Sequence, residues 1–201
     1  MTVAADGRVR CGWIDHSRLS DDDFVLYRDY HDTEWGRPLR DPGALFERIS
    51  LEAFQSGLSW LIILRKRENF RAAFDRFDAE RVARYTERDV ERLMSDVGIV
   101  RNRAKIEATI ANARVVADMA DDGVDLAELL WSFAPADRAT RVRPASLSDV
   151  AAVTAESKAM AKELKKRGMR FVGPTTAYAL MQATGMVDDH VSACWVPRPD
   201  S

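Results

Sequence analysis

The sequence has only two cysteines, Cys11 and Cys194, and they stand near opposite ends of the chain. In a reducing compartment, a widely separated pair is more often a metal or core pair than a disulfide. The longest strongly apolar run, residues 60–64, is far shorter than the roughly 20 residues that cross a bilayer. Residues 1–10 also lack the apolar core of a secretory signal. We therefore expect a cytoplasmic protein without a membrane span.

The chain carries little net charge, −2 at pH 7, so no global positive field indicates a nucleic-acid partner. Such a partner is not excluded, because phosphate binding depends on where the basic residues lie. Proline and glycine are scarce, at 7 and 10 residues, while 46% of the residues are hydrophobic. This composition is typical of a folded protein, and 201 residues suit one domain or two small lobes around a groove.

Strand-like alternation of apolar and polar residues is also missing, whereas apolar residues recur at helical spacing. The sequence therefore predicts an all-α fold. Start and stop signals predict helices over residues 42–56, from 59 onward, and over 87–97, 102–119 and 154–167. Residues 134–150 are rich in Pro, Arg, Ser and Asp, which predicts a connection and a candidate boundary between lobes.

The two cysteines and two of the three histidines form a candidate metal site. Cys11 and His31 lie near the start of the chain, and His190 and Cys194 lie near its end. The four-residue offset of the second pair is expected to place both on one face of a helical turn. Zinc binds such a set in a closed tetrahedron, which is a structural site. Buried cysteines and hydrogen-bonded histidines would give the same pattern, while His16 is expected on the surface or in a loop.

Residues 165–177 have the features of two helices joined by a hairpin. A basic helix end is followed by Gly168, a short apolar link, Gly173 and then Pro174 at the start of the next helix. Glycine lets the backbone turn tightly against a phosphate, and free amides at a helix N-terminus point at the anion. The expected DNA-binding residues are Lys166, Gly168, Arg170, Gly173 and Thr175. An ordinary connection between packed helices fits this segment as well.

Glu52 stands inside the apolar stripe of the helix predicted over residues 42–56, shortly before Gly57 and Trp60. A carboxylate there is either a functional acid or a capped or salt-bridged helix residue. An enzyme that acts on a base must hold it between aromatic faces and read its edge by hydrogen bonds. Trp60 is the best stacking candidate, with core packing as the alternative.

Two further aromatic residues adjoin the candidate metal ligands. Tyr30 immediately precedes His31, and Trp13 follows Cys11 by two residues. Closing the two ends of the chain around a metal could therefore bring these rings to the neighbourhood of Glu52 and Trp60. This would form a cage for a base.

Several stretches together resemble the DNA-3-methyladenine glycosylase I family, namely residues 10–13, 30–36, 58–60, 66–69, 166–168, 171–173 and 189–190. The similarity runs in order from about residue 10 to residue 197. It implies an α-helical fold of the helix-hairpin-helix glycosylase superfamily. A structural zinc would join the termini through Cys11, His31, His190 and Cys194.

The resemblance also implies an activity. A member of this family hydrolyses the N-glycosidic bond of 3-methyladenine in alkylated double-stranded DNA by base flipping, leaving an abasic site and the free base. Glu52 and Tyr30 would hydrogen-bond the base, and Trp60 would pack on its ring with Trp13 nearby. N3 methylation makes the base a cationic leaving group, and a carboxylate could stabilise the sugar cation. We expect a monomer.

Two departures from the family pattern concern the site. Ala53 and Phe54 stand where the family often has Gly and a varied residue, and Asp188 stands where it usually has Asn. In related helix-hairpin-helix glycosylases, Val-Asp-x-His carries the catalytic aspartate, and residues 187–190 resemble that pattern. Asp188 is therefore a candidate catalytic residue. A helix N-cap and a partner that orients His190 are equally good interpretations.

Two other functions fit parts of the sequence. A zinc-stabilised DNA-binding protein without catalysis would keep the hairpin, but Glu52 beside Tyr30 and Trp60 argues against it. A helical protein-interaction domain would use the aromatic residues only as core. Salt-sensitive DNA binding would distinguish the protein-interaction domain from the glycosylase and from the non-catalytic DNA-binding protein.

Overall fold

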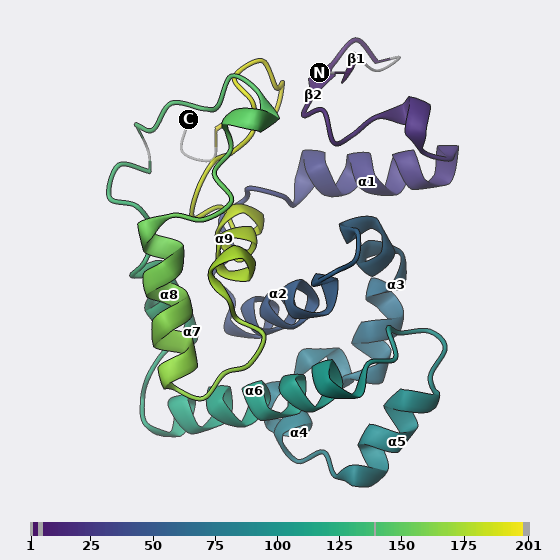
Figure 1. Ribbon diagram of the computed structural model, residues 1–201, viewed down its shortest axis with the longest axis vertical. Coiled ribbons are helices and arrows are strands. Elements are labelled where there is room, and N and C mark those ends of the chain that lie inside the picture. The colour runs from purple at the N-terminus through teal and green to yellow at the C-terminus, as the bar shows by residue number, and fades with distance from the viewer. Residues whose placement is uncertain (1, 4–5, 139, 199–201) are drawn as a thin grey trace.

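The computed structural model describes residues 2–3, 6–138 and 140–198, and helices form most of it (Figure 1). The α-helices are α1 (Asp21–Thr33), α2 (Pro42–Gln55), α3 (Trp60–Ala73), α4 (Ala79–Ala83), α5 (Glu87–Ser95), α6 (Arg103–Asp121), α7 (Leu126–Trp131), α8 (Ala155–Lys166) and α9 (Pro174–Ala183). Short 3-10 helices are η1 (His16–Arg18), η2 (Asp75–Phe77) and η3 (Leu147–Asp149). Strands β1 (Thr2–Val3) and β2 (Val9–Arg10) form an antiparallel pair with Val3 opposite Val9. Apart from this pair, the helical prediction is confirmed.

Side-chain caps fix the start of several predicted helices. The Asp41 carboxylate accepts a hydrogen bond from the Ala44 amide at 2.8 Å, and Pro42 opens α2. Asn102 caps α6 in the same way, and Thr154 forms a capping box at the start of α8. Each such cap stabilises its helix by about 1 kcal/mol. The predicted starts of these helices are confirmed.

Two features of the helices differ from the prediction. Helix α5 begins after the predicted Thr86 capping box but ends at Ser95, before Gly98, because Asp96 leaves helical geometry and accepts a hydrogen bond from the Gly98 amide at 2.7 Å. Helix α1 was not predicted. Only Tyr30 and His31 of its residues are buried, so its sequence has no clear apolar stripe.

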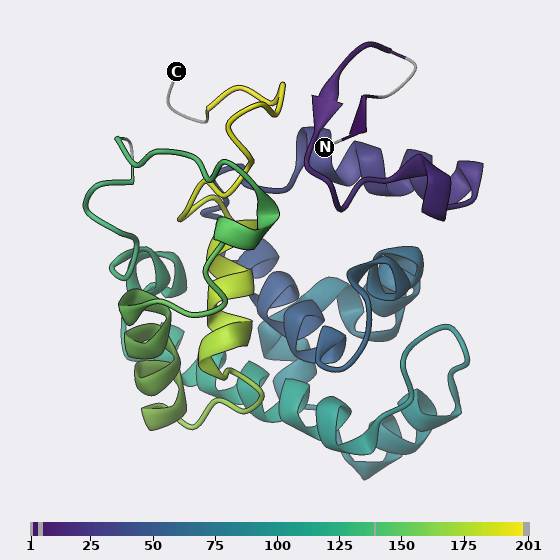
Figure 2. The same cartoon turned by 45° about the horizontal axis from the view of Figure 1, so that its top comes forward.

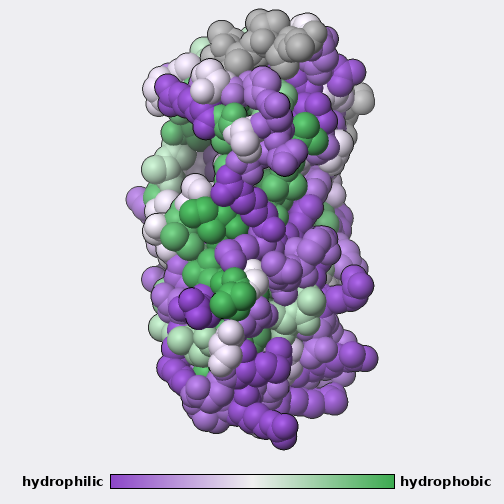
Figure 3. Space-filling model, turned by 90° about the vertical axis from the view of Figure 1, so that its right-hand side faces the viewer, coloured by the Kyte–Doolittle hydropathy of each residue, from purple (hydrophilic) through white to green (hydrophobic). Residues whose placement is uncertain are grey.

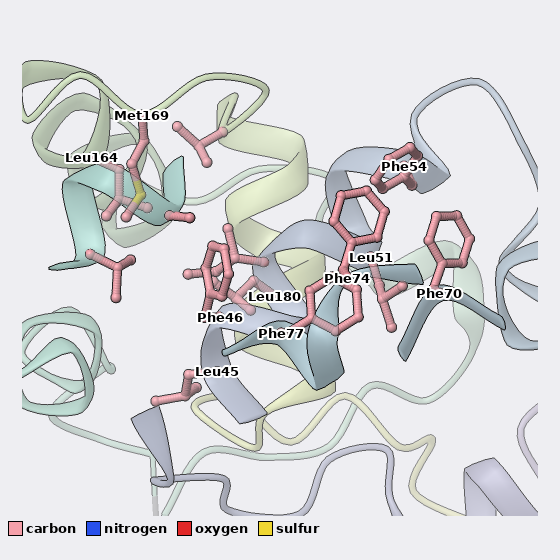
Figure 4. Close-up of a cluster of buried hydrophobic side chains, with 14 of the residues drawn as sticks. Leu45, Phe46, Leu51, Phe54, Phe70, Phe74, Phe77, Leu164, Met169 and Leu180 are labelled. Carbon is pink, nitrogen blue, oxygen red and sulfur yellow. The ribbon is translucent and has the colours of Figure 1, made fainter. Parts of the chain in front are cut away.

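The core surrounds α2, which packs against α3, α6, α7 and α9. Phenylalanine rings from α2, α3 and η2 gather on one side of it (Figure 4). Phe54 and Phe70 have ring centres 4.7 Å apart, and Phe74 stacks on Phe77 at 5.5 Å. Replacing such a buried ring by alanine costs about 3–5 kcal/mol. This packing holds the C-terminal half of α2 in place.

Strand β2 and residues 191–198, near the two ends of the chain, lie on the same side of the molecule, above α9 (Figures 1 and 2). The Trp195 amide donates to the Val9 carbonyl at 2.9 Å, which joins the C-terminal segment to β2. The Ser192 amide donates to the Pro144 carbonyl at 2.8 Å, so the connection before α8 packs on this segment too. Residues 134–150 form this connection as predicted, with η3 as the helix found in their described part.

The surface over α1, α3 and α5 is mostly hydrophilic, with apolar patches in its middle (Figure 3). Among the helices of the described chain, none combines the length and the apolar character that a bilayer crossing needs.

Candidate functional site

A cavity of about 310 Å³ opens between α1, α2, α9 and η3. Four residues that the sequence predicted to surround a base, Trp13, Tyr30, Glu52 and Trp60, all line it. Its other lining residues are Tyr27, Trp35, Gln55, Leu147, Val150, Ala179, Gln182 and Asp189. A volume of this size lies within the range of small-molecule pockets. We call this space the base cavity.

Glu52 is a buried acid on α2 with 5% of its surface exposed. Its neighbours Leu51 and Phe54 pack in the core, so the helix cannot rotate the carboxyl group into solvent. No described residue forms a hydrogen bond or ion pair with it, so the capped or salt-bridged alternative is wrong. Burial raises its pKa to about 7, against the opposing charge of Arg48. A cation in the cavity would favour the ionised form.

Aromatic rings form the wall around this acid. The ring centres of Tyr30 and Trp60 lie 5.4 Å apart, and Trp13 lies 6.4 Å from Tyr30. Trp60 is the first residue of α3, directly after the turn at Gly57. Its indole nitrogen is buried and has no hydrogen-bond partner among the described residues. Burial raises the pKa of Tyr30, so its hydroxyl keeps its proton at neutral pH.

A second carboxylate in the base cavity, Asp189, was not predicted. Its Oδ2 atom accepts hydrogen bonds from the Tyr178 hydroxyl at 2.6 Å and from Gln182 Nε2 at 2.9 Å. Both donors lie on α9, and Gln182 lines the cavity as well. The signal in the sequence was the pair of adjacent aspartates, of which the family pattern pointed to Asp188.

Asp188 itself is not among the described residues that line the base cavity. Its Oδ2 atom accepts a hydrogen bond from Arg143 Nε at 2.8 Å, and its Oδ1 atom accepts one from the His190 amide at 3.3 Å. No helix of the described chain begins after Asp188, so the helix N-cap alternative is wrong. The contact with His190 fits the alternative in which Asp188 orients that histidine.

The four candidate metal ligands, Cys11, His31, His190 and Cys194, lie together and are all buried. Their ligand atoms lie within 4.8 Å of one another. Cys11 Sγ lies 3.6 Å from His190 Nδ1, and Cys194 Sγ lies 3.6 Å from both His31 Nε2 and His190 Nδ1. A tetrahedral zinc site separates sulfur and nitrogen ligands by about 3.5 Å. The cluster could therefore hold a metal ion, and its donor set suits zinc.

The other nitrogen of each histidine ring is also engaged. His31 Nδ1 lies 2.8 Å from Asp32 Oδ1, and His190 Nε2 lies 3.2 Å from the Trp35 carbonyl. Such partners fix the ring orientation that metal ligation needs. The predicted helical turn between His190 and Cys194 is wrong. The chain forms a tight turn there, in which the Cys194 amide donates to the Val191 carbonyl at 2.8 Å.

His16 lies in η1 with its side chain exposed, next to Asp21, as predicted.

A short connection joins α8 to α9 at the place where the sequence predicted a hairpin between two helices. Gly168 has φ +98°, a conformation that favours glycine. The side-chain amide of Asn112 donates a hydrogen bond to the Arg170 carbonyl and accepts one from the Arg170 backbone amide. Gly173 precedes α9, and no side chain caps that helix end. Lys166, Gly168, Arg170 and Thr175 are exposed, and Gly173 is half-buried.

A second hollow of about 230 Å³ lies between the start of α9 and the turn before α3, next to the base cavity. Thr175 and Thr176 of α9 line one side of it, and Leu58 of the turn before α3 lies on the other. Glu52 lines both hollows. The uncapped start of α9 therefore lies at the approach to the base cavity.

Comparisons with known proteins agree with this arrangement. Residues 21–197 match the family described as methyladenine glycosylase. The chain is 47% identical over 186 residues to DNA-3-methyladenine glycosylase 1 of Escherichia coli (strain K12), covering 92% of this chain and 95% of that protein. It is 42% identical over 185 residues to DNA-3-methyladenine glycosylase of Haemophilus influenzae, covering 92% and 96%.

Solved structures give the same result. A crystal structure of 3-methyladenine DNA glycosylase I matches with a TM-score of 0.84 at 45% identity, covering 93% of this chain and 98% of the other. A Staphylococcus aureus structure that describes 3-methyladenine recognition by this enzyme matches with a TM-score of 0.78 at 35% identity, covering 86% and 92%. The chain therefore belongs to the methyladenine glycosylase family.

Proposed function

We propose that this protein is a DNA repair glycosylase that hydrolyses the N-glycosidic bond of 3-methyladenine in alkylated double-stranded DNA. The observation that carries this proposal is the meeting of Glu52, Tyr30 and Trp60 in one cavity of purine size. The relatives named as 3-methyladenine glycosylases cover nearly the whole chain and support the same reaction.

The cavity suits a flipped, positively charged base. Trp60 and Tyr30 offer aromatic faces, and base–aromatic stacking contributes about 1–3 kcal/mol. The Glu52 carboxyl group lies without a protein partner, so it is available to a cationic base and ionises more readily beside one. Cleavage breaks the bond between the sugar C1′ and the base nitrogen, whose electron pair leaves with the base as neutral 3-methyladenine. A water oxygen then bonds to C1′, its proton is lost to solvent, and an abasic site remains.

The roles of the two aspartates differ in this proposal. Asp189 faces the base cavity, so it is the carboxylate better placed to stabilise the sugar cation. Asp188, the candidate from the family pattern, contacts Arg143 and the His190 backbone instead. We therefore propose that Asp188 orients His190 and that Asp189 acts beside Glu52 in the cavity.

We also propose that residues 165–177 bind DNA as a helix-hairpin-helix. The uncapped start of α9 offers backbone amides to a phosphate, and exposed Lys166 and Arg170 add positive charge. Leu58 is 37% exposed at the approach to the base cavity. Apolar side chains in such positions can wedge between bases and stabilise an extruded nucleotide.

A structural zinc ion at Cys11, His31, His190 and Cys194 completes the proposal. It would contribute folding free energy by tying the N-terminal segment to the C-terminal segment, and it would leave no coordination position for chemistry. We propose that the chain acts as one glycosylase domain, and its action as a monomer in the cytoplasm stays a prediction.

A base-release assay tests the function. Purified protein is incubated with methylated double-stranded DNA, and the released bases are separated by chromatography. We expect release of 3-methyladenine and little release by Glu52→Ala at an unchanged circular dichroism spectrum. Salt-sensitive DNA binding without base release would instead favour the non-catalytic DNA-binding protein.

A further inference from the structure

Arg48 is a buried cation directly behind the wall of the base cavity. It lies on α2, one helical turn before Glu52, and only 7% of its surface is exposed. Its guanidinium carbon lies 5.3 Å from the ring centre of Tyr30 and 5.1 Å from that of Trp60. Arg48 is not among the described residues that line the cavity, so it contacts both aromatic walls from the outside.

One hydrogen bond from this guanidinium determines the role of the Tyr30 hydroxyl. Arg48 Nη1 lies 3.0 Å from Tyr30 Oη in a buried contact. Arginine offers only donors, so the tyrosine oxygen accepts this bond. The phenol proton remains available, and no described residue accepts it. Because Tyr30 lines the base cavity, a ligand in the cavity is the remaining acceptor.

The carboxylates near Arg48, including Glu52, interact with its charge but are not paired with it as closely as Tyr30 is. Glu34 lies 3.7 Å from Arg48 Nη2, but it is paired closely with Arg67 at 2.6 and 2.9 Å. Among the described residues, no carboxylate forms a short two-point pair with Arg48. Burying a cation with so little pairing costs free energy, and a role at the cavity accounts for its position.

We propose that Arg48 is a positioning residue for the glycosylase reaction, because it holds the Tyr30 oxygen as an acceptor and so makes that hydroxyl a donor to the bound purine. This inference rests on the proposed function. When the glycosidic bond breaks, its electron pair moves onto the base, whose unmethylated ring nitrogens become better acceptors. A hydrogen bond from Tyr30 therefore strengthens as the base leaves. A cation that donates to the phenol oxygen strengthens it further.

A double-mutant cycle tests this coupling. Release of 3-methyladenine is measured under single-turnover conditions for wild type, Arg48→Met, Tyr30→Phe and the double variant. We expect each single substitution to slow release about tenfold or more, as for a lost hydrogen bond to a charged group. The double variant should be within about twofold of Tyr30→Phe, because Arg48 acts through the hydroxyl. Losses that multiply in the double variant would overturn the proposal.

Arg71→Met is the matched control. Arg71 pairs with Glu47 of α2 at 2.8 Å and does not contact Tyr30 or Trp60. We expect unchanged release from this variant. A loss as large as that of Arg48→Met would mean that the loss of any ion pair made by α2 suffices, which contradicts a positioning role. If Arg48→Met does not fold, Arg48→Gln replaces it in the same cycle.

Binding of free 3-methyladenine, followed by tryptophan fluorescence, separates this inference from the proposed function. If the wild-type protein releases no base, the proposed function is contradicted. The coupling between Arg48 and Tyr30 is then tested by measuring the Kd of free 3-methyladenine for the same four proteins. We expect Arg48→Met to weaken that binding in the protein that carries Tyr30 but not in the Tyr30→Phe variant. Equal weakening with and without the Tyr30 hydroxyl would contradict the inference.

Discussion

Tyr178 donates a hydrogen bond to Asp189 across 2.6 Å, and Gln182 donates to the same carboxylate oxygen at 2.9 Å. Both donors come from α9, the helix that follows the proposed DNA-binding hairpin. The carboxylate is thereby held in one orientation at the wall of the base cavity. Preorganised groups of this kind stabilise charge that develops in a transition state, since they need no reorganisation.

The first prediction compares the two adjacent aspartates. Asp189→Asn removes the charge that faces the cavity, and we expect the rate of base release to fall about 10- to 100-fold with little change in DNA affinity. Asp188→Asn is the matched control, because its carboxylate contacts Arg143 and a backbone amide instead. It should change turnover less than about twofold. A large loss for Asp188→Asn at unchanged binding would reverse the two assignments.

The second prediction concerns the stability cost of Glu52. Burial raises its pKa to about 7 in the folded chain, against an ordinary value of 4.5. Between these values the folded chain binds more protons than the unfolded chain, so stability is full below about 4.5 and falls as pH rises through about 7. Glu52→Gln removes this dependence. Above pH 7 it should be more stable than wild type, by on the order of 3 kcal/mol.

Urea unfolding at pH 5 and pH 8 measures this difference, and the same variant should lose base release at both values. If the difference in free energy of unfolding between Glu52→Gln and wild type does not grow between pH 5 and pH 8, the Glu52 carboxyl group is solvated in the folded protein.

The sequence predicted those parts of the fold and site that have a local signal. Asp41, Asn102 and Thr154 carry the capping chemistry that begins a helix, so these starts were visible. Glu52 and the Cys2His2 set were candidates from the residues alone, each with an equally good or better structural interpretation, and the resemblance to the family favoured their functional roles.

Other parts of the site depend on tertiary packing. Asp189 and Gln182 enter the cavity because α9 packs beside α2, and no local pattern reveals this. Arg48 looks like a surface arginine in sequence, and only the approach of α1 brings Tyr30 to it. Helix α1 itself has too few buried positions to show a stripe.

The third prediction concerns the metal cluster. Cys194→Ser replaces a thiolate by a weak ligand, so zinc content and thermal stability should fall together. His16→Ala is the control, because that histidine is exposed and its side chain pairs with Asp21 and lies against Phe24, not against the metal cluster. It should leave both unchanged. Elemental analysis and thermal unfolding measure the two quantities, and wild-type protein purified without chelators but free of zinc would end the proposal of a zinc site.

The fourth prediction concerns DNA binding by the hairpin. Lys166→Gln and Arg170→Gln each remove one exposed positive charge from the end of α8 and from its connection to α9. If each charge neutralises a phosphate, affinity falls equally for methylated and unmethylated duplexes. The slope of log K against log salt should then decrease by about one unit per substitution. Arg18→Gln is the control, since Arg18 is a similarly exposed arginine in η1, directly before α1, an element far from the hairpin in Figure 1. Fluorescence anisotropy with duplex DNA over a salt series measures the slope. An equal decrease for all three variants would indicate a diffuse electrostatic field, and the hairpin would lose its assignment as the phosphate-binding element.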